Sequence, residues 1–262
     1  MVAVAAEPMS ISTTMWSDVS ATSASDWSVG ARAMIGSPSR SVATGGLALS
    51  LGGARRRELA YAATKRALDL FVAVVLLVML LPLFALIGLA VLFDSGAPIL
   101  YRAERVGRFG RPFTVVKFRS MRPNADITAH MAFVRELLRD ATSCSVYKVP
   151  ADRRITRVGA FLRRTSLDEL PQLWNVLRGD MSLVGPRPDV VYAVADYDDW
   201  MHRRLMVKPG ITGLWQVSGR SRLSLRDMYR LDLNYASTAS LSLDLSILMR
   251  TVPVVLGRDG AA

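Results

Sequence analysis

The sequence predicts a mainly helical α+β fold that combines one strongly apolar helix with a compact domain holding a small β element. The apolar helix is predicted because Leu70 to Phe93 are 24 consecutive residues without a charged side chain. The β element is predicted because β-branched and aromatic residues concentrate between Ile99 and Met121. Helical spacing of apolar residues returns between Ile127 and Asp140, and again after Asp227.

Composition and charge narrow the classes of partner and metal that fit this protein. The chain has 262 residues and a formal net charge of +11, of which about +10 lies after residue 60. Such a charge suits polyanionic partners, namely nucleic acid, anionic lipid head groups or phosphorylated substrates. One cysteine, Cys144, and two histidines, His130 and His202, argue against a zinc site and favour a hard cation held by carboxylates and phosphates.

The chain divides into three predicted parts. Residues 1–54 are rich in Ser, Ala, Gly and Thr without persistent apolar periodicity, which predicts a disordered tail; a docking or regulatory arm is the alternative. Residues 55–97 hold a basic flank and the apolar helix. Residues 98–262 form the predicted compact domain, in which the segment from Leu241 to Leu256 is assigned to the core or to a membrane interface.

The apolar segment is long enough to cross a membrane, but two features complicate a simple crossing. A straight helix of this length reaches roughly 36 Å, against about 30 Å for a hydrocarbon core. Pro82 stands in its middle and bends the helix by removing a hydrogen bond. Both flanks are basic, so no charge bias orients the segment. A spanning helix and a re-entrant helix therefore fit the residues equally well.

The β element is predicted to be a hairpin whose turn contains Gly107 and Gly110. Its second strand, Pro112 to Arg119, carries Lys117 and Arg119, which could hold phosphates. The simpler interpretation is a solvated basic hairpin that lies against anionic lipid, and charge alone favours it.

Two adjacent carboxylates, Asp168 and Glu169, follow a strongly basic stretch. Ser166 and Glu169 have the spacing of a capping box, which is a common helix start. Pro171 fits the helix better if Asp168 is the N-cap instead. In both cases the two carboxylates lie at a helix N-terminus, which favours anions.

This position, together with Arg163 and Arg164, is expected to keep Asp168 ionised at neutral pH. An ionised carboxylate can attack phosphorus or hold a divalent cation against a diphosphate. Downstream, two prolines brace Arg187, a side chain suited to bidentate phosphate binding, although a surface turn is the simpler interpretation. Glycine-containing turns near Gly213 and Arg220 repeat this combination of a turn and a nearby cation.

In their order along the chain these motifs resemble the bacterial sugar transferase family, the monotopic polyprenyl-phosphate phosphoglycosyl transferases. The resemblance covers about Lys65 to Gly257 and rests on the following motifs: Lys65-Arg66-Ala67-Leu68-Asp69, Tyr101-Arg102, Arg105-Val106-Gly107, Lys117-Phe118-Arg119-Ser120-Met121, Leu162 to Gln172, Gly179 to Pro188, Lys208 to Gly213, and Trp215 to Arg220. One departure is visible, because many members carry Ser-Pro at the helix bend, where this chain has Leu81-Pro82.

The resemblance implies a re-entrant helix, bent at Pro82, on a catalytic domain with interfacial helices that faces the cytoplasm at the bacterial inner membrane. It also implies transfer of a sugar 1-phosphate from a UDP-sugar to undecaprenyl phosphate, with release of UMP and use of Mg²⁺. In these terms Asp168 is the nucleophile and Glu169 holds the metal or positions the diphosphate, with Asp168 a second candidate metal ligand. The remaining implied roles are phosphate binding by Lys117, Arg119, Arg164 and Arg187, and nucleotide proximity for Gly213 and Arg220.

Two other function classes stay open at this stage. A membrane-tethered nucleic-acid-binding protein would use the basic charge, but no nucleic-acid motif is present, and we expect no nucleic-acid partner. A non-catalytic membrane scaffold would use the two carboxylates only as a helix cap. The sequence identifies neither the sugar nor the polysaccharide pathway. It also leaves the oligomeric state open, a homo-oligomer included.

Overall fold

The computed structural model describes residues 44–122, 128–139, 152 and 154–257, and this part of the chain is mostly helical with two small sheets. The predicted α+β class is therefore confirmed. The predicted tail, 1–54, lies outside the described residues as far as residue 43, and a helix already begins at Thr44.

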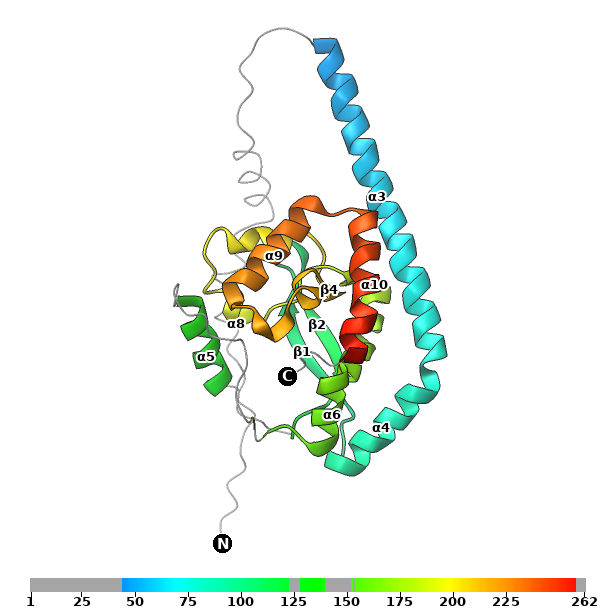
Figure 1. The fold of residues 1–262 in the computed structure, drawn as a ribbon, viewed down its shortest axis with the longest axis vertical. Helices are drawn as coiled ribbons and strands as arrows, with labels where there is room; N and C mark the ends of the chain where they lie inside the picture. Colours follow the sequence, from blue (N-terminus) through cyan, green and yellow to red (C-terminus); the bar gives the residue numbers. More distant parts are fainter. Residues whose placement is uncertain (1–43, 123–127, 140–151, 153, 258–262) are drawn as a thin grey trace, which may run out of the picture. The chain divides into compact units, whose positions relative to one another are not determined.

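The α-helices, in chain order, are α3 (Thr44–Met79), α4 (Leu81–Ser95), α5 (Thr128–Arg139), α6 (Arg157–Thr165), α7 (Leu173–Arg178), α8 (Val191–Val194), α9 (Leu225–Thr238) and α10 (Leu241–Gly257) (Figure 1). The 3₁₀ helices are η2 (Arg108–Gly110), η3 (Leu167–Gln172), η4 (Met201–Met206), η5 (Trp215–Val217) and η6 (Arg220–Arg222). The strands are β1 (Leu100–Val106), β2 (Pro112–Phe118), β3 (Ser182–Val184) and β4 (Gly210–Thr212).

The apolar segment forms two helices rather than one. The chain leaves helical geometry at Leu80, and Pro82 falls in the first turn of α4, where its missing N–H needs no partner. No side chain caps this helix start, because the N-cap residue, Leu80, has no hydrogen-bonding side chain. The sequence thus placed the bend correctly, but Pro82 separates two helices instead of bending a continuous one.

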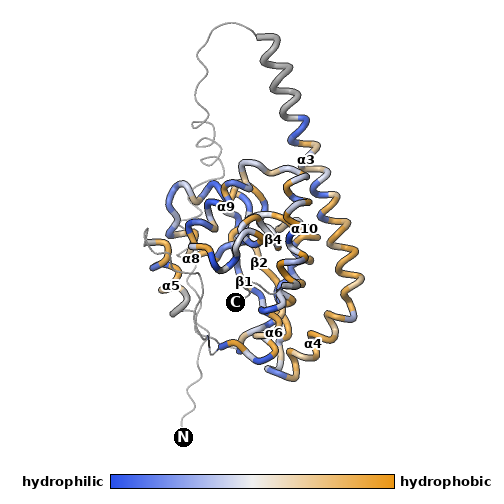
Figure 2. The backbone as a smooth tube through the Cα atoms, viewed as in Figure 1, coloured by the Kyte–Doolittle hydropathy of each residue, from blue (hydrophilic) through white to orange (hydrophobic). Residues whose placement is uncertain are grey.

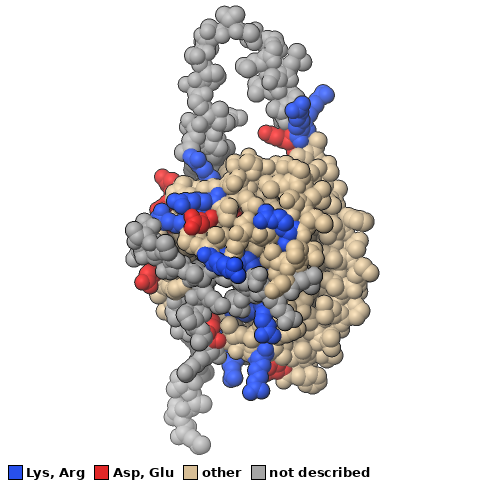
Figure 3. Space-filling model, in the orientation of Figure 1, with Lys and Arg blue, Asp and Glu red and all other residues tan. Residues whose placement is uncertain are grey.

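No single helix in the described part of the chain is long and apolar enough to span a membrane. The pair formed by Arg56–Met79 and Leu81–Ser95, which meet at 62°, passes that test together. Hydropathy is high along the last turns of α3 and most of α4 (Figure 2). In the space-filling view, charged side chains lie at the upper end of α3, and none shows along the right-hand margin below them (Figure 3). Large apolar side chains are exposed on these two helices, including Phe71, Met79, Leu81 and Phe93.

The predicted hairpin is confirmed. Strands β1 and β2 pair antiparallel with Tyr101 opposite Lys117 and Arg105 opposite Phe113. Because directly opposed residues point to the same face of a sheet, Arg105 and Lys117 share a face. A second, parallel pair joins β3 to β4. This pairing brings the loop after β3, which carries Arg187, close to β4.

Three apolar clusters hold the domain together. The first gathers side chains from α3, β2, α7, β3 and α10, including Ala73, Val176 and Ile247. The second unites α5, α8 and α9 around residues such as Val134. The third packs α4 against β2 and α6, through Ile87, Val91, Phe118 and Leu162.

Polar side chains also fix α3 to the domain. Asp244 of α10 is 1 % exposed; it pairs with Lys65 (Nζ to Oδ2, 2.9 Å) and accepts hydrogen bonds from Tyr61 and Tyr235. One turn further along α3, Asp69 accepts a hydrogen bond from the Leu183 amide of β3 (3.0 Å). A buried carboxylate needs such partners, so α3 is bound tightly at this level.

We predict that Lys65→Met lowers the free energy of unfolding by about 3 kcal/mol, because it leaves the Asp244 charge buried without a cation. The double variant Lys65→Met/Asp244→Leu should recover part of this loss, which urea unfolding in detergent would measure. Arg230→Ala removes a solvent-exposed pair with Asp227 and serves as the control, with a cost below about 1 kcal/mol. Equal losses in the single and double variants would contradict the prediction.

Candidate active site

The two adjacent carboxylates lie in the short helix η3, which follows α6 without an intervening loop. Ser166 ends α6 in a left-handed conformation (φ 57°), and η3 begins at the next residue. No side chain caps η3; instead, the carbonyl of Ser166 accepts a hydrogen bond from the Glu169 amide (3.2 Å). Ser166 therefore occupies the N-cap position, as one prediction had it, but its side chain does not cap η3. The alternative N-cap, Asp168, lies inside the helix, so capping does not explain this pair of carboxylates.

Glu169 is held by two cations from distant segments. Lys117 of β2 lies 2.9 Å from its Oε1, while Arg187 donates to Oε1 (2.6 Å) and Oε2 (3.1 Å) in a bidentate pair. Burial alone would raise the pKa of Glu169, but Arg187 and Lys117 outweigh it and hold that pKa well below its usual range. Glu169 is therefore a permanently ionised anchor.

Asp168 is in a different environment. It is 8 % exposed, and within the described part of the chain no group donates a hydrogen bond to its side chain. Burial first, and the charge of Glu169 second, raise its pKa, against the opposing charges of Lys117, Arg163 and Arg187. That Asp168 is ionised at neutral pH stays a prediction: arginine charges favour the ionised form as expected, but desolvation is the larger effect on this pKa and acts against it.

The basic groups around the two carboxylates are partly desolvated. Burial, and then the charge of Arg187, lower the pKa of Lys117, while Glu169 and Asp168 act in the opposite direction. Burial likewise lowers the pKa of Arg220, whose next strongest influences are Glu169 and Arg187. Lys117, Arg187 and Arg220 therefore surround the carboxylates as the sequence suggested.

Arg119 and Arg164 lie elsewhere. Arg119 is 5 % exposed, and its Nη2 donates to the carbonyl of Ser95 (2.8 Å) and to that of Gly96, so it closes the C-terminal end of α4. Arg164 is exposed on α6 and makes no described contact with Asp168 or Glu169. Its neighbour Arg163 is the arginine of α6 that acts on Asp168. The structure thus does not bring Arg119 or Arg164 to the carboxylates.

Gly213 supports the site through the backbone. A Cβ at this position would lie 2.4 Å from the carbonyl oxygen of Gly185, so only glycine allows the two loops to approach this closely. The Gly185 amide in turn donates to the Thr212 carbonyl (2.9 Å). Both contacts fix the loop that carries Arg187.

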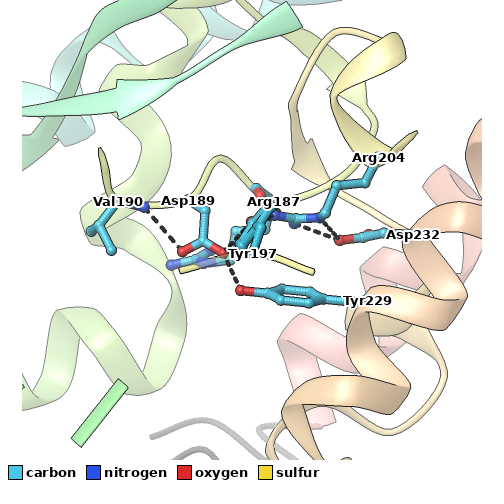
Figure 4. A network of polar contacts seen from close by, with 7 residues as sticks. All are labelled: Arg187, Asp189, Val190, Tyr197, Arg204, Tyr229 and Asp232. Carbon is cyan, nitrogen blue, oxygen red and sulfur yellow. Dashed lines mark hydrogen bonds and ion pairs between the residues drawn. The ribbon is translucent and has the colours of Figure 1, made fainter. Parts of the chain in front are cut away.

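A buried network behind this loop positions Arg187 (Figure 4). Arg204, 2 % exposed, donates through Nη2 to the carbonyl oxygen of Arg187 (2.7 Å) and through Nε to Asp232 (3.0 Å). Its Nη1 reaches Asp189, which also accepts hydrogen bonds from Tyr197 and Tyr229. A rigid guanidinium fork thereby joins the loop to α9.

Comparison with known proteins gives the family. The model of the family described as bacterial sugar transferase matches residues 60–258. The chain belongs to the bacterial sugar transferase family. All the residues placed above in and around the site fall within that match.

Similar sugar transferases include a UDP-galactose-lipid carrier transferase of Erwinia amylovora, 46 % identical over 197 residues, and the undecaprenyl-phosphate galactose phosphotransferase of Salmonella typhimurium, 44 % identical over 197 residues. Each alignment covers 75 % of this chain but only 41 % of the relative. The UDP-glucose:undecaprenyl-phosphate glucose-1-phosphate transferase of Caulobacter vibrioides is 40 % identical over 75 % of this chain and 71 % of its own length.

The described residues of this sugar transferase contain no group of three or more His, Cys, Asp or Glu side chains that could hold a metal ion. The two available carboxylates still fit Mg²⁺, which commonly takes one or two carboxylates and completes its shell with substrate phosphates and water. Because Glu169 is already paired with two cations, the less engaged Asp168 is the more available ligand.

Sequence reasoning did not identify Arg204 as a residue that supports the site. It also did not distinguish Arg163, which acts on Asp168, from Arg164, which does not. Arg203 and Arg204 read as an ordinary basic pair, and nothing local distinguishes the buried member from the exposed one. The partners of Arg204 are distant in sequence, as Asp232 illustrates. The one available signal was the helical position of Arg163, one residue from Arg164 and so turned about 100° from it.

We predict that Arg204→Lys speeds amide hydrogen exchange in residues 185–190, because one ammonium cannot bridge Asp232 and the Arg187 carbonyl together. The free energy of unfolding should fall by about 2 kcal/mol. Exchange measured by mass spectrometry on the full chain tests this, with the exposed neighbour variant Arg203→Lys as the control. Unchanged protection of residues 185–190 would remove Arg204 as the support of the loop.

Proposed function

We propose that this sugar transferase moves a hexose 1-phosphate from a UDP-sugar to undecaprenyl phosphate and releases UMP. The observation that carries the proposal is the contrast within one pair of carboxylates. Among the described residues none donates a hydrogen bond to the Asp168 side chain, whereas Glu169 is fixed by Arg187 and Lys117. One carboxylate is left to react while its neighbour organises the cations. A non-catalytic scaffold is less well supported, because neither carboxylate caps a helix.

In the proposed reaction, a carboxylate oxygen of Asp168 attacks the sugar-side phosphorus. The bond between that phosphorus and the bridging oxygen breaks, and UMP leaves with the electron pair. The phosphate of undecaprenyl phosphate then attacks the phosphosugar–aspartate and regenerates the Asp168 carboxylate. The lipid product is a diphosphate that carries the sugar.

The neighbouring residues of Asp168 have supporting roles in this scheme. Lys117 and Arg187 offset the negative charge that develops on the phosphate oxygens, and Arg220 adds positive charge nearby. Glu169 keeps Lys117 and Arg187 in place. Mg²⁺, held by Asp168 or Glu169 together with the diphosphate, would supply further charge neutralisation.

We also propose that α3 and α4 enter one leaflet and return. The two helices leave the bend in different directions, yet both pack on the same domain: α3 through Lys65 and Asp69, and α4 through Ile87 and Val91. If the start of α3 and the end of α4 are both attached to one domain, both ends lie on the same side of a membrane. For this orientation we propose the cytoplasmic face of a bacterial inner membrane, with the lipid-linked product entering exopolysaccharide or related glycoconjugate synthesis.

We predict that Asp168→Asn lowers UMP release more than about a thousandfold, because an amide is not a nucleophile. Wild-type protein incubated with UDP-sugar alone should gain the mass of a hexose phosphate, and this adduct should be absent from Asp168→Asn. Intact mass spectrometry and a UMP assay in detergent measure both effects. Asp198→Asn, at an exposed carboxylate, is the control. Wild-type activity in Asp168→Asn would contradict the proposed mechanism.

A pH profile of UMP release provides a separate test. The raised pKa of Asp168 should move the acidic limb above the range of an ordinary aspartic acid, since only the deprotonated form attacks. The lowered pKa of Lys117 should set the basic limb, where its ammonium loses its charge. Lys117→Arg keeps the charge at high pH and should shift that limb upward. Identical basic limbs in both proteins would exclude Lys117 from this role.

A further inference from the structure

A small pocket beside Glu169 contains polar groups that the scheme above does not use. It is lined by Arg105, Val115, Lys117, Gln172, Arg187 and Pro188. Arg105 and Lys117 reach it from the same face of the hairpin, with Val115 between them on that face. Gln172 enters from the end of η3, four residues after Asp168. Three cationic side chains and one amide therefore converge on one cavity.

Two of these groups are not fully satisfied by the residues that the structure describes. Gln172 is 2 % exposed, and its Nε2 has no hydrogen-bond partner in the described part of the chain. A buried amide N–H without an acceptor costs about 1 to 3 kcal/mol, which a bound oxygen would recover. Arg105 forms no ion pair with any described residue. The pocket thus offers a hydrogen-bond donor and an unneutralised cation to an anion.

The position of the pocket indicates which anion it takes. Strand β1 begins just after α4, and Arg105 lies about 16 Å further along it at the usual rise per residue. The pocket therefore extends from Lys117 along the hairpin in the direction away from α4. A lipid phosphate arrives from the apolar helices, whereas a soluble nucleotide has no such restriction.

We propose that Arg105 and Gln172, together with Lys117 and Arg187, bind the phosphate of the nucleoside monophosphate that leaves. This inference rests on the proposed function and adds two residues to it. Gln172 donates through Nε2 to a phosphate oxygen, and Arg105 neutralises charge that appears on the departing group. The pocket is thus specific for the nucleotide side of the diphosphate rather than for the sugar or the lipid.

Isothermal titration of the full chain in detergent with UMP tests the inference. Arg105→Gln and Gln172→Met should each weaken UMP binding about tenfold, while Arg105→Lys should lose less. Arg102→Gln is the matched control, because Arg102 is exposed on the same strand and points to the other face of the hairpin. The UMP affinity of this variant should equal that of the wild-type protein. The KM for the UDP-sugar should rise in parallel with the dissociation constant for UMP, and the KM for undecaprenyl phosphate should not change.

The outcomes separate the two proposals. Unchanged UMP affinity in Arg105→Gln and Gln172→Met, in proteins with wild-type melting temperatures, would overturn the pocket assignment while the transferase proposal stands. A higher KM for undecaprenyl phosphate with unchanged UMP affinity would assign the pocket to the acceptor and also overturn it. If the wild-type protein binds UMP through Arg105 but converts no UDP-sugar, the transferase proposal is contradicted and the pocket remains a nucleotide site.

Discussion

The shared ion pair of Glu169 is the constraint around which the site is built. A carboxylate with this little solvent cannot stay charged without partners, and its partners come from β2 and from the loop after β3. Satisfying one buried charge therefore fixes the hairpin, the short helix η3 and the Arg187 loop relative to one another. Asp168 precedes Glu169 in η3, so its position is fixed by the backbone of this helix, although no described residue donates a hydrogen bond to its side chain.

The sequence predicted local elements well because their signals are local. The hairpin follows from a concentration of β-branched and aromatic residues and from the glycines of its turn, and the break near Pro82 follows from proline geometry. The adjacent carboxylates were recognisable as unusual in a basic stretch. The 3₁₀ conformation of η3 was not, since Pro171 also fits the first turn of an α-helix.

Electrostatic roles were harder to predict because they depend on contacts between distant segments. Arg119 has the composition of a phosphate ligand, yet it binds the carbonyls at the end of α4. Arginines were expected to favour the ionised form of Asp168, and Arg163 does so, but burial has the larger effect on the pKa of Asp168 and raises it. Arg204 gave no signal, because its importance lies in partners such as Asp189 and Asp232. Charge counts indicate where cations lie, whereas burial decides what they do.

The length of α4 has a further consequence if the bent pair enters and returns as proposed. Its 15 residues span about 22 Å, less than a hydrocarbon core of about 30 Å. Arg119 fastens the end of α4 to the strand that carries Lys117, so the depth of the helix and the height of the site above the bilayer are set together. Such an enzyme has access to lipids of one monolayer only, and its product needs separate transport to reach the opposite side.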